Sequence, residues 1–159
     1  MGMQRTPDSR KLTDQAFFVT AAVRDHVPVF AESGTAQIVL DTLQFFRSRH
    51  EMDLYGYVIM PDHVHAVVNL HAPLMLPDLM RRFKSYVARQ IGHGAIWQHG
   101  YWSQAIPNGQ ILVQKLQYML HNPVRKGLVR KPEDYEWSSA KDLLRDVPKT
   151  VDPWGTLMR

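Results

Sequence analysis

Two histidines, one residue apart, stand in a segment with the alternation of a half-buried strand. His63 and His65 alternate with apolar side chains from Val64 to Leu70, and this period of two predicts a strand with one face in the core. Residues i and i+2 of a strand point to the same side, so the two imidazoles are expected to lie next to each other. Histidine is the commonest metal-ligating side chain, and the pair could bind one metal ion. The alternative is two surface histidines on an exposed sheet face.

A second reactive group stands at the end of an expected helix. Tyr118 and Asn122 are four residues apart, which places them on one helix face. The phenol has a pKa of about 10 and is a weak nucleophile, but it can attack a phosphodiester that a metal polarises. The amide oxygen of Asn122 could supply a third ligand, and such a nitrogen and oxygen set suits Mg²⁺ or Mn²⁺, although two histidines can also bind zinc. From spacing alone, one tyrosine among six is more often structural than catalytic.

Basic residues gather on another expected helix and after the tyrosine. The helix at 77–91 carries cations on its polar faces and no acid after Asp78. These cations either contact phosphates or form an ordinary solvated face. The aromatic residues Trp97, Tyr101 and Trp102 could stack on unpaired bases or belong to the core. The candidate phosphate contacts, chosen by charge and position, are Arg81, Arg82, Lys84, Arg89, Arg125 and Lys126.

The hydrophobic pattern predicts the elements that carry these residues. Strands are expected at 15–23, 53–60 and 63–70 and within 96–106, and helices at 35–50, 77–91, 109–121 and 138–146. Pro61-Asp62 predicts a turn that joins the second and third strands into an antiparallel hairpin. The order strand, helix, hairpin, helix, strand, helix is that of a split βαβ arrangement in the α+β class. We therefore expect an antiparallel sheet with helices packed on one face and the histidine strand near its centre.

Length and composition predict one domain. With 159 residues the chain can build a single core, and we expect a polar lead-in at 1–14, the domain at 15–146 and a C-terminal tail at 147–159. The chain has no cysteine, which excludes disulfides and thiolate zinc sites and suits a cytoplasmic protein. It shows no apolar run of membrane-spanning length and no signal peptide, so no membrane contact is expected. The net charge of +4 is a modest indication of a polyanionic partner.

Three segments together resemble the single-tyrosine HUH transposases, and most closely the REP-associated tyrosine transposases. The segments are Met-Pro-Asp-His-Val-His at 60–65, Tyr-Met-Leu-His-Asn-Pro-Val-Arg-Lys-Gly-Leu-Val at 118–129 and Pro-Glu-Asp-Tyr-Glu-Trp-Ser-Ser at 132–139. The resemblance runs from about Phe17 to Ser139 and keeps the order and spacing of the family. Asp62 stands where many relatives carry Asn, and Ser103-Gln104 replaces a pattern that contains an aspartate. Neither departure removes a catalytic group.

The resemblance implies a ferredoxin-like core and a metal-dependent reaction on DNA. It makes His63 and His65 the HUH metal ligands, Asn122 the third ligand and Tyr118 the nucleophile, with Mg²⁺ or Mn²⁺ as the cofactor. The implied enzyme nicks single-stranded DNA at a hairpin, forms a 5′-phosphotyrosine with a free 3′-hydroxyl, and rejoins the strand. Mobile members of the family act as homodimers whose subunits exchange the tyrosine helix. Members of the domesticated branch can also act as monomers, so the resemblance leaves both oligomeric states open for this chain.

Two other functions are compatible with the sequence. The first is a catalytically idle domain that binds hairpin DNA on the same scaffold, and the presence of every expected catalytic residue favours the enzyme over it. The second is a His-x-His metal phosphodiesterase of unrelated fold that uses activated water. Such sites recruit further ligands, for which only Asn69 and His71 are nearby. A salt-sensitive affinity for hairpin DNA separates the first two functions from the third.

Overall fold

A four-stranded antiparallel sheet with the order β2-β3-β1-β4 forms the centre of the protein. The computed structural model describes residues 15–92, 94–144 and 149–153, so the expected lead-in at 1–14 and most of the expected tail lie outside the described residues. The strands are β1 Ala16–Ala22, β2 Met52–Met60, β3 His63–Leu70 and β4 Trp102–Ala105. This is the strand order of a split βαβ fold. The predicted α+β class, the antiparallel sheet and the central position of the histidine strand are confirmed.

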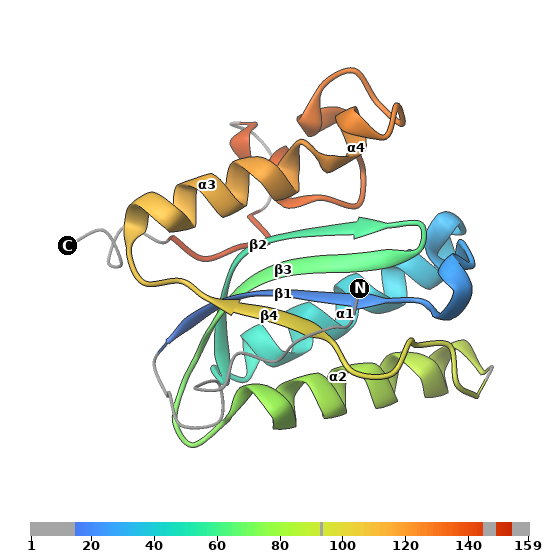
Figure 1. Cartoon of the computed structure of the whole chain (residues 1–159), viewed down its shortest axis with the longest axis horizontal. Helices are drawn as coiled ribbons and strands as arrows, with labels where there is room; N and C mark the ends of the chain where they lie inside the picture. Colours follow the sequence, from blue (N-terminus) through green and yellow to red (C-terminus); the bar gives the residue numbers. More distant parts are fainter. Residues whose placement is uncertain (1–14, 93, 145–148, 154–159) are drawn as a thin grey trace.

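Two helices cover one face of the sheet, as the sequence predicts. They are α1 Ser33–Ser48 and α2 Leu76–Ile91, and Figure 1 shows both on the same side of the strands. Their apolar stripes pack on a core that includes Phe17, Val19, Val64, Ala66 and Val68. These residues alternate along β1 and β3, so the histidines between them point to the other face.

A third helix lies on that other face, which the expectation of helices on one face alone did not include. It is α3 Gly109–Leu120, and it leads into the short α4 Asn122–Arg125. The sheet face that carries the histidines also carries apolar side chains, and α3 packs on these side chains and buries them. The second core contains Phe18, Val58, Val67, Leu112, Leu116 and Met119. None of the helices in the described ranges is long and apolar enough to cross a membrane.

Gly56 of β2 allows α3 to approach the sheet closely. A Cβ atom at this position would lie 2.6 Å from Cδ2 of Leu116 and 2.8 Å from Cε of Met119. Both distances are shorter than carbon atoms tolerate, so a side chain larger than hydrogen would require Leu116 and Met119 to repack or α3 to move outward. The glycine therefore allows the packing of Leu116 and Met119 that holds the helix of Tyr118 on this face of the sheet.

Gly56→Ala is expected to lower the free energy of unfolding by about 1–3 kcal/mol, because the added methyl group overpacks the contact with α3. Urea unfolding measures the change. Gly34→Ala is the matched control, since a Cβ there meets nothing within 4 Å and alanine favours a helix. A Gly56→Ala protein as stable as the wild type would show that α3 does not depend on this close approach.

The chain after α4 returns to the open edge of β2. The amide of Ile59 donates to the carbonyl of Trp137 over 2.7 Å, and the amide of Leu54 donates to a carboxylate oxygen of Asp152 over 2.8 Å. The 3-10 turns η4 Pro132–Asp134 and η5 Ser139–Leu143 belong to this return. It satisfies backbone groups that an edge strand would otherwise leave unpaired. Residues 149–153, which fall in the expected tail, thus include contacts with the sheet.

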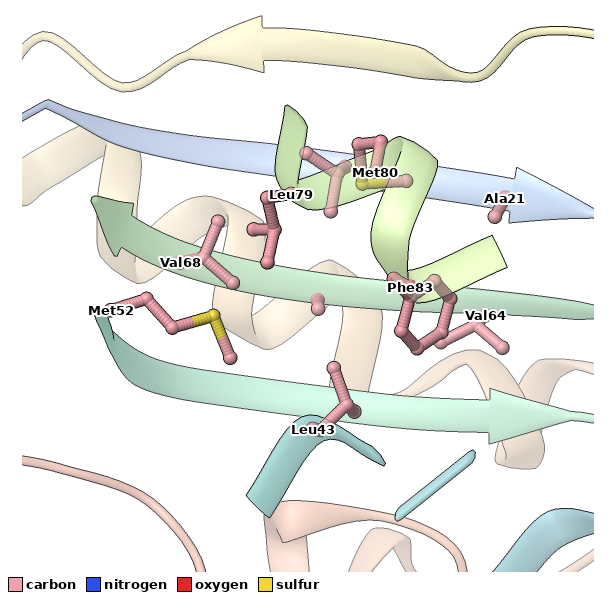
Figure 2. A pocket seen from close by; sticks show the side chains of 10 residues that line it. Ala21, Leu43, Met52, Val64, Val68, Leu79, Met80 and Phe83 are labelled. Atoms are coloured by element: carbon pink, nitrogen blue, oxygen red, sulfur yellow. The ribbon is translucent and has the colours of Figure 1, made fainter. Parts of the chain in front are cut away.

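The core between the helices and the sheet holds a small apolar cavity of about 20 Å³. Figure 2 shows side chains of α2, among them Leu79 and Phe83, pointing from one side and Leu43 of α1 pointing from another. Every residue that lines the cavity is apolar, and a single water without polar partners gains nothing there. The cavity lies on the face opposite the histidines, so it is a feature of core packing and not part of the candidate site.

Candidate active site at the histidine pair

β3 places His63 and His65 side by side. Their Nε2 atoms lie 3.1 Å apart, and their ring centroids are 4.6 Å apart. Two ligand atoms at right angles around one ion, each about 2.1 Å from it, are separated by about 3 Å. The two imidazoles therefore have the spacing of two ligands of a single metal ion.

Each histidine has a partner on its outer ring nitrogen. Oδ1 of Asp62 lies 2.7 Å from Nδ1 of His63, and Oγ1 of Thr20 on β1 lies 2.7 Å from Nδ1 of His65. A carboxylate only accepts, so His63 carries its proton on Nδ1 and presents the lone pair of Nε2 to the site. This is how proteins commonly fix the tautomer and direction of a metal-binding histidine.

The electrostatic environment keeps His65 neutral. Burial, with smaller contributions from the neighbouring His63 and Arg125, lowers the pKa of His65 to about 3. The ring of Phe18 covers His65 at a centroid distance of 5.3 Å. For Asp62, burial acts to raise the pKa, but the hydrogen bond and charge of His63 outweigh it and the pKa is lowered. A neutral His65 and an ionised Asp62 are the forms that favour metal binding by the pair.

Acidification from about pH 6.5 toward pH 4 is expected to destabilise the metal-free protein through His65. In the unfolded chain His65 takes up a proton near the ordinary histidine pKa of 6.5, whereas in the folded chain its pKa is about 3. The unfolded state then binds more protons, so stability falls as the pH falls, by on the order of 1 kcal/mol per pH unit from this group. Thermal melts in EDTA across this range measure the slope. His65→Gln should flatten it, and an unchanged slope would contradict the assignment.

Asn122 approaches the histidines from the junction of α3 and α4. Its amide Nδ2 lies 3.2 Å from Nε2 of His63, and the side chain is buried. A half-turn of the amide brings the oxygen, which is the metal-binding atom, to the same place. Among the residues that the structure describes, no three His, Cys, Asp or Glu side chains gather as a metal site. The structure thus brings His63, His65 and Asn122 together, and their donor atoms fit a divalent cation.

Tyr118 lies in the last turn of α3, four residues before Asn122, which begins α4. Its side chain is 55% exposed. The guanidinium of Arg125 lies 4.2 Å from the centre of the phenol ring and donates to the carbonyl of Tyr118. Because Arg125 also lowers the pKa of His65, this cation lies near both the tyrosine and the histidine pair.

The other predicted cations separate into two groups. Lys126 joins Arg125 at the site, where it lines a groove of about 410 Å³ with His63 and His26. Arg81, Arg82, Lys84 and Arg89 are on α2, which covers the opposite face of the sheet.

Three of the α2 cations have contacts within the protein, and the longest joins Arg81 to Asp78 of the same helix over 4.0 Å. Arg82 pairs with Glu51 over 2.6 Å, and Lys84 donates to the carbonyls of Gln98 and Gly100 over 2.9 and 2.6 Å. The structure therefore does not bring the α2 cations to the histidine pair, and a DNA contact through α2 stays a prediction.

Comparison with known proteins places the chain in a family. Residues 15–118 match the family model described as transposase, IS200 like. The chain belongs to the IS200-like transposases. The matched range includes both histidines and ends at the tyrosine, and the resemblance read from the sequence motifs is confirmed.

Three individual relatives of this IS200-like transposase carry the name of one group, the REP-associated tyrosine transposases. A Haemophilus influenzae protein named for the REP-associated tyrosine transposases is 25% identical, over 87% of this chain and 86% of its own length. The REP-associated tyrosine transposase of Escherichia coli is 28% identical, over 64% of this chain and 60% of its own length. A solved REP-associated tyrosine transposase bound to a REP hairpin has a TM-score of 0.76 and 20% identity, with coverage of 96% of this chain and 92% of that one. This last likeness shows that the fold is shared.

Sequence reasoning missed several residues at the site of this transposase. Thr20 contacts His65 from a strand 45 residues earlier in the chain, and Lys115 lies over the rings of Phe18 and Trp102. Strand register decides both contacts, and the sequence carries no local signal for it. Of the aromatic residues left open above, Trp97 and Tyr101 are buried, whereas Trp102 is partly exposed.

Proposed function

We propose that this transposase nicks and rejoins single-stranded DNA with Tyr118 as its nucleophile. The observation that carries the proposal is the convergence of His63, His65 and Asn122 beside the helix turn that holds an exposed tyrosine. Hairpin DNA is the proposed substrate, in accord with the REP hairpin bound by the structural relative.

The two histidine Nε2 atoms and the Asn122 amide oxygen would hold Mg²⁺ or Mn²⁺. Such an ion, when bound, polarises the scissile phosphate and stabilises the charge that develops on it. The Nδ1 partners of the histidines keep both imidazoles aimed at one point, so the two rings need not reorganise during the reaction.

Tyr118 performs the exchange of bonds. Its oxygen attacks the phosphorus and loses its proton to solvent, which reaches the exposed phenol. The bond from phosphorus to the 3′ oxygen breaks, and the departing oxygen takes up a proton. The products are a 5′-phosphotyrosine and a free 3′-hydroxyl. One phosphodiester replaces another, so the reverse attack by a hydroxyl rejoins the strand without an external energy source.

The cations beside Tyr118 suit the charge of this substrate. Arg125 lies near both the nucleophile and the histidines, and Lys126 lines the groove that opens beside His63. A guanidinium can bind two phosphate oxygens at once, which would fix the scissile group in line with the phenol.

We propose further that Tyr118 acts within its own chain. α3 packs on the β2 strand of the same chain through Leu116 and Met119 at Gly56. This contact supports a complete site in a monomer, with no exchange of helices between two copies.

Covalent capture tests the proposal. End-labelled hairpin oligonucleotides with the single-stranded flanks of the gene are incubated with the protein and Mn²⁺ or Mg²⁺, and then separated on a denaturing protein gel. A labelled adduct that EDTA abolishes is the expected result. Hairpin binding without any adduct across the flanking sequences would instead identify a catalytically idle DNA-binding domain.

A further inference from the structure

We infer that Lys115 and Trp102 bind the DNA strand on the β4 side of the active site, the lysine through a phosphate and the tryptophan by stacking on an unpaired base. This inference rests on the proposed function and assigns residues to one flank of the scissile phosphate. It concerns contacts that do not depend on the base sequence.

Strand register puts Trp102 in line with the active site. Trp102 of β4 pairs with Thr20 of β1, and Thr20 pairs with His65 of β3. These three residues therefore form a row across the sheet, and Trp102 lies two strands, or about 10 Å, from the histidine. β4 is the last strand of the described sheet on this side, so the partly exposed indole borders solvent.

Aromatic rings fill the space between Trp102 and the histidine pair. The ring of Phe18 stacks on His65 at 5.3 Å and meets the edge of Trp102 at 5.5 Å. Phe18 and His65 are buried, so among these rings the partly exposed Trp102 is the one that can offer a face to a ligand. Single-stranded DNA exposes the faces of its bases, which stack on exposed aromatic side chains whatever their sequence.

Lys115 supplies the positive charge for this surface. It lies three residues before Tyr118 on α3, so the two side chains share one helix face. Its ammonium is 5.6 Å from the ring centre of Phe18 and 5.9 Å from that of Trp102. Within the described ranges, no carboxylate lies at ion-pair distance from this ammonium. Its charge is therefore available to a phosphate.

Together these contacts define a path for the strand. The groove lined by Lys126 lies beside His63, and the surface of Trp102 and Lys115 lies beyond His65. A strand that touched both would pass its scissile phosphate over the two histidines, next to Tyr118. The alternative is that Lys115 only covers the buried Phe18 ring with its aliphatic stem.

Binding measurements on four variants distinguish these alternatives. The affinity of a fluorescent hairpin with single-stranded flanks is measured by anisotropy at several salt concentrations. Lys115→Gln is expected to reduce the slope of log affinity against log salt by about one. Trp102→Leu is expected to weaken binding by about tenfold, while Trp102→Phe keeps most of it because a ring remains. Arg49→Gln is the control: this exposed arginine pairs with Glu51 at the end of α1 and should change neither quantity.

Abasic substitution identifies the stacked base. Each flanking nucleotide is replaced in turn, and at one position the wild type should lose about tenfold in affinity while Trp102→Leu loses nothing more. If Trp102→Leu does not fold, the salt slope of Lys115→Gln and the quenching of wild-type tryptophan emission by DNA, lost in Trp102→Phe, decide the question.

The outcomes separate a failure of this inference from a failure of the proposed function. Wild-type affinity and slope in both Lys115→Gln and Trp102→Leu would overturn the inference and leave the proposed function intact. A Trp102→Leu loss that persists at every abasic position would also overturn it, because that loss is structural. A wild type that binds no single-stranded or hairpin DNA would overturn the proposed function and this inference with it.

Discussion

Tyr118→Phe is expected to reduce the yield of the covalent DNA adduct by roughly a thousandfold or more and to leave hairpin affinity within about twofold of the wild type. The substitution removes one oxygen atom from a side chain that is 55% exposed, so little packing is lost. The phenylalanine ring can still lie against Arg125. A large loss of the adduct with unchanged binding is the signature of a nucleophile and not of a structural residue. Gel analysis of the adduct and anisotropy of the same hairpin measure the two quantities in parallel.

Tyr86→Phe is the matched control for this change. Tyr86 is also exposed, at 44%, but it lies on α2 on the opposite face of the sheet. It should form the adduct at the wild-type rate. An adduct that persists in Tyr118→Phe would mean that another group, or water, attacks the phosphate. A mixture of Tyr118→Phe and His63→Ala proteins should also form none, because each chain uses its own tyrosine; restored activity would indicate exchange of α3 between subunits.

His63→Ala is expected to weaken Mn²⁺ binding by about a hundredfold or more and to abolish the adduct. It removes a ligand and also leaves the carboxylate of Asp62 without the imidazole that it now orients. Changes to outer-sphere partners alone commonly reduce metal affinity by about 10–100-fold, and loss of a ligand exceeds that. Titration calorimetry or electron paramagnetic resonance of Mn²⁺ measures the affinity without reference to DNA.

His71→Ala is the control for the metal. His71 follows the other end of β3 and pairs with Asp53 over 2.9 Å, so it should not affect Mn²⁺ binding. The comparison also tests the unrelated phosphodiesterase, which would recruit His71 as a further ligand. Equal losses in His63→Ala and His71→Ala would contradict the site described above.

The sequence predicted the local relations of the site and not the long-range ones. The adjacency of His63 and His65 follows from the period of a strand, and the spacing of Tyr118 and Asn122 from the period of a helix. Both are set within a few residues of chain, so a pattern can reveal them. That Asn122 reaches His63 depends on α3 crossing a sheet face that sequence reasoning left uncovered. The apolar Phe18 and Val67 were the available signal for that helix.

Charge was the weaker guide to function. Helix α2 has the densest run of cations, yet Arg82 and Lys84 make contacts within the protein. The helix also covers the sheet face that points away from the histidines. A run of basic residues shows that a surface is polar, and tertiary packing decides what that surface meets. Lys115 is the single charged residue of α3, so composition gave no reason to select it. Its position beside Trp102 became evident only from the register of β4 with β1.

Mass spectrometry of the covalent adduct identifies the nucleophile most directly. After nuclease trimming and trypsin digestion, the nucleotide should be found on the peptide 116–125, Leu-Gln-Tyr-Met-Leu-His-Asn-Pro-Val-Arg, which contains one tyrosine and no serine or threonine. The expected product is a 5′-phosphate on Tyr118 that is stable to acid, which separates it from an acid-labile link to His121. A nucleotide found on any other residue, or attached through its 3′ end, would contradict a 5′-phosphotyrosine intermediate on Tyr118.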